Sequence, residues 1–131
     1  MRREFNLSEQ DLEFLDSSDY SWETINLQGN WVLIHQYPIP KGYNHSETSL
    51  ALRLDSGYPN VQIDMVYFFP HLSRIDGKII GAISTQLIDG KQWQRWSRHR
   101  TKVNPWRPEI DCIATHLGLV LHWLEREFKL R

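Results

Sequence analysis

Residues 113–128, with the sequence IATHLGLVLHWLEREF, contain the strongest periodic signal in the chain. Apolar side chains recur every three or four residues, at Ile113, Leu117, Val120, Leu124 and Phe128. That spacing places them on one side of an α-helix, so the pattern predicts a long helix whose apolar side packs on a core. Pro108 fits the first position of this helix, because that position needs no hydrogen-bond donor.

The first half of the chain predicts a short helix and then a set of β-strands. Residues Leu7–Asp16 are expected to form the helix, with Ser8 as its N-terminal cap. Alternating apolar residues and turn signals predict four strands, at Trp22–Gln28, Trp31–Tyr37, Thr48–Leu54 and Val61–Phe69. Residues Ser84–Asn104 are polar and basic without a clear period, so we interpret them as an irregular segment. The sequence therefore predicts an α+β fold in a single domain, residues 1–131. Its order is an N-terminal helix, a four-stranded antiparallel meander, an irregular segment and a long C-terminal helix.

Composition excludes several classes of protein. The 131 residues include 15 basic and 16 acidic side chains, for a formal net charge of −1, whereas nucleic-acid-binding domains usually have a basic excess. The single cysteine can form neither an internal disulfide nor a cysteine-rich zinc site. No apolar run is long enough for a secretory signal or a membrane span, so we expect a cytoplasmic protein that contacts neither nucleic acid nor membrane.

Several short motifs resemble one known superfamily. Tyr58-Pro59 lies before the last predicted strand of the meander, and Trp106-Arg107-Pro108 lies before the long helix, as in ubiquitin-conjugating enzymes. More narrowly, the chain resembles prokaryotic ubiquitin-conjugating-like family E over about Phe14–Phe128. The motifs behind this narrower resemblance are Gly42–His45, Gly57–Pro59, Asp64-Met65 and Trp93–His99. The resemblance implies a bacterial ubiquitin-like modification pathway, with a ubiquitin-like protein and its adenylating activating enzyme as partners.

The chain departs from that superfamily at its nucleophile. Counting back from Trp106 by the superfamily spacing leads to Arg98, and counting forward from Phe69 leads to Ile80-Gly81. Neither place holds a cysteine, and the His-Pro-Asn tripeptide is missing. The only cysteine, Cys112, falls inside the predicted long helix. Cys112 and His116 are four residues apart and could form a thiolate–imidazole pair, but we favour packing for this cysteine.

Ser97 and His99 are candidate catalytic residues. Alternate positions on a strand share one face, so His99 could act as a base toward the Ser97 hydroxyl and generate an oxyester acceptor. Asp89 or Asp111 could supply an orienting carboxylate. In the alternative interpretation, Trp93, Trp96 and His99 pack the irregular segment onto the sheet.

A basic run next to the tryptophans predicts a partner surface or, equally, a solvated face. The candidate partner-binding residues are Trp93, Trp96, Arg95, Arg98, Arg100 and Trp106, followed by Lys102. The histidines show no metal-ligand spacing and the glycines no phosphate-binding order, so we expect neither a metal nor another cofactor.

Three hypotheses follow from the sequence. The first is a conjugating-enzyme-like pseudoenzyme that lacks thioester chemistry and binds or positions a ubiquitin-like protein. The second is an active acyl carrier that uses Ser97 with His99. The third is a binding module of a bacterial stress or antiviral defence complex.

Overall fold

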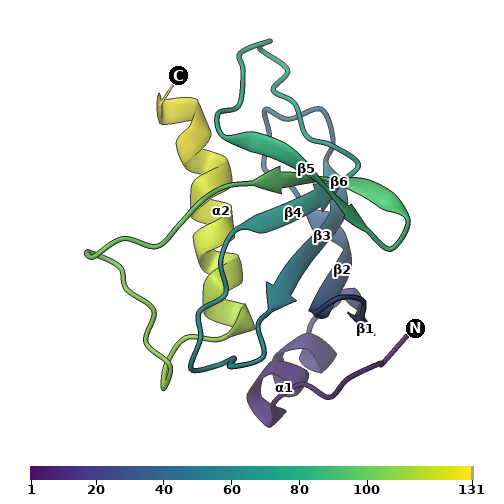
Figure 1. The fold of residues 1–131 in the computed structure, drawn as a ribbon. Helices are drawn as coiled ribbons and strands as arrows, with labels where there is room; N and C mark the ends of the chain where they lie inside the picture. The colour runs from purple at the N-terminus through teal and green to yellow at the C-terminus, as the bar shows by residue number, and fades with distance from the viewer. Residues whose placement is uncertain (131) are drawn as a thin grey trace.

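The computed structural model describes residues 1–130, which form two helices and a six-stranded antiparallel sheet (Figure 1). Helix α1 (Glu9–Ser17) comes first, and helix α2 (Ile113–Leu130) comes last. The strands between them are β1 (Ser21–Asn26), β2 (Asn30–Pro38), β3 (Glu47–Leu54), β4 (Val66–Phe69), β5 (Ile83–Ile88) and β6 (Lys91–Trp96). The predicted α+β class is confirmed, and Ser8 caps α1 by accepting the Asp11 backbone N–H at 3.3 Å.

The number of strands differs from the prediction. The sheet order is β1-β2-β3-β4-β6-β5, so the predicted four-stranded sheet is extended by a hairpin on the far side of β4. Residues 84–96 of the predicted irregular segment belong to that hairpin. Asp89 and Gly90 connect its strands with φ angles of +53° and +80°, the left-handed conformation that two-residue hairpin turns require. An Asp-Gly pair is a sequence signal for such a turn.

Two predicted element boundaries were wrong. The strand expected over Val61–Phe69 begins only at Val66, after Met65 with φ of +63°. The long helix begins at Ile113 rather than near Pro108. Between Pro108 and the helix the chain makes a separate turn, in which the Arg107 carbonyl accepts the Asp111 N–H at 2.7 Å.

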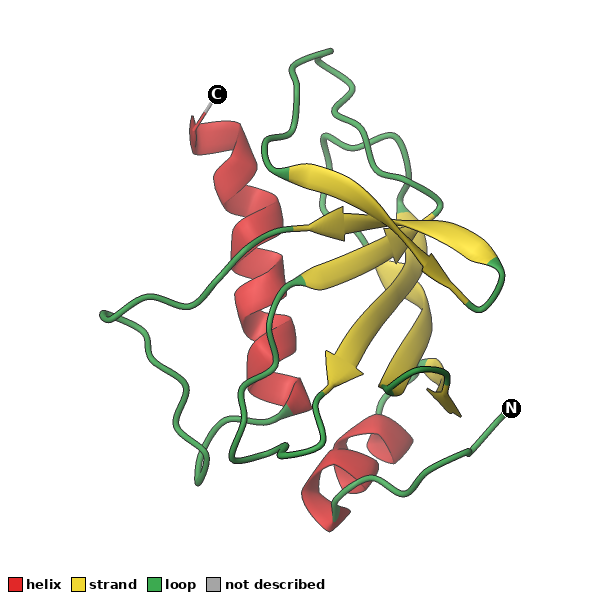
Figure 2. Ribbon diagram, in the orientation of Figure 1, coloured by secondary structure: helices red, strands yellow, loops and turns green. Residues whose placement is uncertain are grey.

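Apolar residues fill both faces of the sheet. On one face α2 crosses the strands (Figures 1 and 2). Its side chains join a large core with Val32, Leu50 and Phe68. The opposite face carries a second group that we call the outer cluster, formed by Ile25, Trp31, Leu33, Ala51, Tyr67, Ile88 and Trp93. Neither helix has the length and hydropathy needed to cross a membrane, within residues 1–130.

Candidate functional site

Cys112 lies at the start of α2 and is buried. The residue is 5% exposed, and its backbone carbonyl accepts the His116 N–H at 3.0 Å. The Thr115 hydroxyl accepts the Cys112 backbone N–H at 2.9 Å, so Cys112 occupies the N-cap position of the helix. A thiol in this position is covered by protein, whereas a thiol that transfers acyl groups must reach its substrate.

The His116 ring contacts the backbone of Met65 and not the Cys112 thiol. Its Nε2 lies 2.9 Å from the Met65 carbonyl, and no hydrogen bond joins the ring to Cys112 in residues 1–130. Burial lowers the pKa of His116 to about 4, although the Met65 carbonyl raises it. The ring is therefore neutral at pH 7 and donates its Nε2 proton to Met65.

His99 is oriented by a carboxylate, but not by either of the two that the sequence suggested. Its Nδ1 lies 3.0 Å from both carboxylate oxygens of Asp64. The His99 side chain is 59% exposed, and Nε2 has no hydrogen-bond partner in the described part of the chain. An imidazole held through Nδ1 with Nε2 facing solvent is the arrangement of a positioned base. Asp89 instead binds Arg2, and Asp111 accepts the Arg107 backbone N–H.

Ser97 and His99 line one cavity of about 380 Å³. The cavity lies between the end of β6 and the C-terminal half of α2, where Trp123, Arg126 and Glu127 complete its wall. We call it the Ser97–His99 pocket. Within residues 1–130 no hydrogen bond joins the two side chains, and the Ser97 backbone N–H donates to the Ala82 carbonyl at 3.0 Å. The pocket thus brings both predicted residues together without forming a serine–histidine hydrogen bond.

An ion pair fixes the inner wall of this pocket. The Arg98 guanidinium donates to the buried Glu127 carboxylate at 3.1 Å and to the Gly81 carbonyl at 3.0 Å. Glu127 also accepts the Gly81 N–H at 3.2 Å. The two positions reached by counting from the superfamily motifs, near Arg98 and near Gly81, are therefore neighbours in space. Both counts lead to the edge of the same pocket.

Comparison with protein families gives one match. The sequence profile of prokaryotic E2 family E matches residues 7–127. The chain belongs to this family. Comparisons with curated proteins and with solved structures found no significant match. The family connects this E2-like protein with bacterial ubiquitin-like modification.

Two of the predicted partner-binding residues are core residues of the E2-like fold. Trp93 is 3% exposed in the outer cluster, and Trp96 is fully buried in the core beneath α2. Their indole N–H groups are used internally, by the Ile88 carbonyl and the Gln94 side chain. A partner cannot reach either ring in this conformation, which agrees with the packing alternative for these tryptophans. His99 is exposed, so it does not pack this segment onto the sheet as the two tryptophans do.

The basic run of this E2-like protein divides into separate environments. Arg95 donates to the Ser84 hydroxyl at 2.8 Å, away from the Ser97–His99 pocket. The Arg100 side chain is 5% exposed and lies over the Trp106 ring, with 4.9 Å from Cζ to the ring centroid. Trp106 is half-buried and donates to the Pro59 carbonyl at 2.8 Å. Within this run only Arg98 lies in the wall of the Ser97–His99 pocket, and Lys102 is exposed to solvent in the loop that follows.

No group of three or more histidine, cysteine or acidic side chains is placed to hold a metal ion within residues 1–130. The histidines are used singly: His35 contacts Glu23, His71 contacts the Gln92 carbonyl, and His99 contacts Asp64.

Proposed function

We propose that this family E protein binds and positions a ubiquitin-like protein in a bacterial modification pathway, without forming a thioester. The observation that carries the proposal is the position of Cys112. The only thiol of the chain is buried at the N-cap of α2, so a carrier thioester has no exposed acceptor.

The Ser97–His99 pocket is the proposed contact for the partner's C-terminal tail. It is open, it holds the exposed cation Arg126, and both superfamily counts lead to its edge. The pocket also has an exposed apolar side chain, Leu130, which is 53% exposed. Cationic and apolar groups side by side favour a tail that ends in a carboxylate and is flanked by apolar residues.

Reconstitution tests this function directly. The full chain is mixed with the ubiquitin-like protein and activating enzyme of its host, with ATP, and binding is measured together with intact mass. Arg126→Glu should weaken binding at least about tenfold, because it reverses a charge at the pocket. Lys91→Glu, on the β5–β6 hairpin, is the matched control and should bind normally. A thioester on Cys112 that Cys112→Ser removes would overturn the proposal.

A second function is favoured by one observation, the contact between His99 and Asp64. In that case Ser97 is an acyl acceptor: His99 Nε2 takes the hydroxyl proton, and Ser97 Oγ attacks the carbonyl of the activated tail. The adenylate or thiol of the activating enzyme leaves as an ester bond forms at Ser97. The product is a hydroxylamine-sensitive adduct, which Ser97→Ala should abolish while partner binding persists. Asp64→Asn should slow its formation at least about tenfold, since it removes the group that orients His99. An unmodified mass in the presence of active partners rejects this second function.

A further inference from the structure

One cavity on the far side of the sheet from α2 has no role in the proposed function. It is a cavity of about 580 Å³ between the β1–β2 turn and the tip of the β5–β6 hairpin. We call it the outer-face pocket, and its main lining residues are Leu27, Trp31, Arg53, Tyr67, Leu87 and Arg95. Pockets of about 300–1,000 Å³ are typical of small-molecule sites.

An aromatic pair forms the floor of the outer-face pocket. The rings of Trp31 and Tyr67 meet edge to face, with centroids 5.0 Å apart and an interplanar angle of 79°. Both residues are almost fully buried in the outer cluster. At the rim, Leu27 and Leu87 are 46% and 60% exposed, so apolar surface continues from the floor to solvent. The apolar part of a ligand would cover Leu27 and Leu87 and remove their side chains from water.

Two arginines stand beside this floor. Sheet register places Arg53 opposite Trp31 and Arg95 opposite Tyr67. Arg95 donates to a neutral partner, the Ser84 hydroxyl, and makes no ion pair within residues 1–130. Arg53 approaches the carboxylate of Asp55 only at 3.9 Å, and both side chains are half exposed. The strongest charge at the pocket is therefore an uncompensated guanidinium.

The acidic residue at the pocket does not neutralise these arginines. Asp89 lines the opposite wall, but Arg2 binds its two oxygens at 2.6 Å and 3.1 Å. Both pocket arginines act on the same phenol. Burial raises the pKa of Tyr67, while Arg95 and then Arg53 oppose that rise. Both guanidinium groups therefore carry positive charge near Tyr67, and Arg95 also hydrogen-bonds its side chain.

We propose that the outer-face pocket binds a small apolar carboxylic acid. Its carboxylate lies between Arg95 and Arg53, beside the Tyr67 hydroxyl, and its apolar body packs on the exposed side chains of Leu27 and Leu87, next to Trp31. A guanidinium binds a carboxylate with two parallel charge-assisted hydrogen bonds, and Arg95 uses its Nε, not its terminal nitrogens, for Ser84. This site is on the opposite face of the sheet from the Ser97–His99 pocket and is independent of the proposed function.

A matched pair of probes tests the site in the wild-type chain. The ¹⁵N-labelled protein is titrated with 3-phenylpropanoate and, separately, with 3-phenylpropanamide, which has the same shape and no charge. The acid should shift the indole N–H signal of Trp31 in a saturating manner and leave that of Trp123 in place. The amide should bind at least about tenfold more weakly than the acid, because it cannot form the charge-assisted hydrogen bonds. Equal titration curves for acid and amide, or no shift of Trp31 with either, would overturn the proposal.

Variants then locate the carboxylate. Arg95→Gln and Arg53→Gln should each weaken binding of 3-phenylpropanoate about tenfold. Arg107→Gln, in the exposed loop before α2, is the control and should bind like wild type. Unchanged affinity in both pocket variants would contradict the assignment. Should either variant unfold, the comparison of acid with amide in the wild type still decides the question.

Discussion

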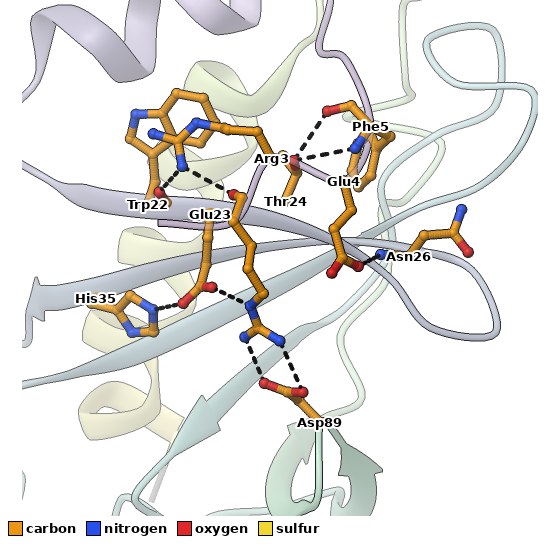
Figure 3. Close-up of polar contacts among 10 residues, drawn as sticks. Arg3, Glu4, Phe5, Trp22, Glu23, Thr24, Asn26, His35 and Asp89 are labelled. Atoms are coloured by element: carbon orange, nitrogen blue, oxygen red, sulfur yellow. Dashed lines mark hydrogen bonds and ion pairs between the residues drawn. The ribbon is translucent and has the colours of Figure 1, made fainter.

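The Arg2 guanidinium joins Asp89 across 87 residues of sequence, with two donor–acceptor distances of 2.6 Å and 3.1 Å. Figure 3 draws these contacts as the two dashed lines that end at the labelled Asp89. Arg2 belongs to the N-terminal segment that lies along β1, and Asp89 is at the tip of the β5–β6 hairpin. β1 and β5 are the two outermost strands of the sheet. Arg2 also donates to Glu23 of β1 at 2.6 Å, so one side chain connects both edges. Ile25 of β1 and Ile88 of β5 both belong to the outer cluster.

We expect a small but measurable coupling between Arg2 and Asp89. Their side chains are 41% and 38% exposed, so solvent screens the pair, and a double-mutant cycle with Arg2→Met and Asp89→Asn should give about 0.5–1 kcal/mol. Urea unfolding at low salt provides the free energies. The pair Arg53 and Asp55, 3.9 Å apart, is the control and should give no measurable coupling. Zero coupling between Arg2 and Asp89 would contradict a role in holding the edges together.

The same pair predicts a pH dependence. The hydrogen bond from Arg2 lowers the pKa of Asp89 below its ordinary value, so its contribution to stability is present above the unfolded pKa of about 3.9. That contribution disappears as the pH falls through the lower pKa of the folded state. Arg2→Met should therefore reduce the acid-induced loss of stability below about pH 4. Unfolding free energies of the variant and wild type between pH 2 and pH 5 test this difference.

His116 should make folding sensitive to mild acid. Burial lowers its pKa to about 4, whereas an unfolded histidine titrates near 6.5, so only the unfolded chain gains a proton between these values. Stability is then complete above about pH 6.5 and falls by up to about 3 kcal/mol as the pH drops to 4. His116→Gln should flatten this part of the curve. His122→Gln, at an exposed position of the same helix, should leave it unchanged, and an equal slope in both variants would contradict the assignment.

Asp11 connects the two ends of the fold and should be costly to remove. It is 1% exposed, and its Oδ1 accepts the Ile113 backbone N–H at 3.1 Å at the start of α2. Its Oδ2 accepts the hydroxyls of Tyr58 at 2.6 Å and Ser8 at 3.1 Å. Asp11→Ala should lower the unfolding free energy by about 3 kcal/mol, since it leaves buried donors without an acceptor. Glu9→Ala, exposed in the same helix, should change it by no more than about 0.5 kcal/mol. Similar losses in the two variants would contradict this role.

Local signals explain which elements the sequence predicted well. The helix cap at Ser8, the alternation over 48–54 and the apolar period of α2 depend on near neighbours, and all three are present. The β5–β6 hairpin also has a local sequence signal, the turn-forming pair Asp89-Gly90. It was missed because Trp93 and Trp96 point to opposite faces of a sheet that is apolar on both, which hides the alternation of a half-exposed strand.

The candidate site depended on contacts that no local pattern encodes. Asp64 is 35 residues from His99, and Asp11 is 102 residues from Ile113. The sequence proposed Ser97 and His99 as candidates from residue type and spacing, and it offered Asp89 or Asp111 as the orienting carboxylate. Both of these are engaged elsewhere, and the choice among aspartates follows only from how the strands are ordered in the sheet.

Two arginines of the predicted basic run should respond to substitution in opposite directions. Arg98 binds Glu127, whose side chain is 1% exposed, at 3.1 Å. Arg98→Met should lower the unfolding free energy by about 2–3 kcal/mol. The reason is that the buried Glu127 carboxylate then loses the cation that balances its charge. Circular dichroism during urea unfolding measures the change.

Arg100 is buried without matching partners. Its Nε and Nη2 atoms have no hydrogen-bond acceptor within residues 1–130, and its Nη1 is 3.7 Å from Asp111. Arg100→Met removes the desolvation cost of these donors and keeps an unbranched side chain over Trp106. The contact of the cation with the Trp106 ring, about 1 kcal/mol, is lost at the same time. We therefore expect a net effect between no change and about 1 kcal/mol of added stability. A loss as large as that of Arg98→Met would instead show that Arg100 binds a group essential to the fold, and would make its environment the next site to examine.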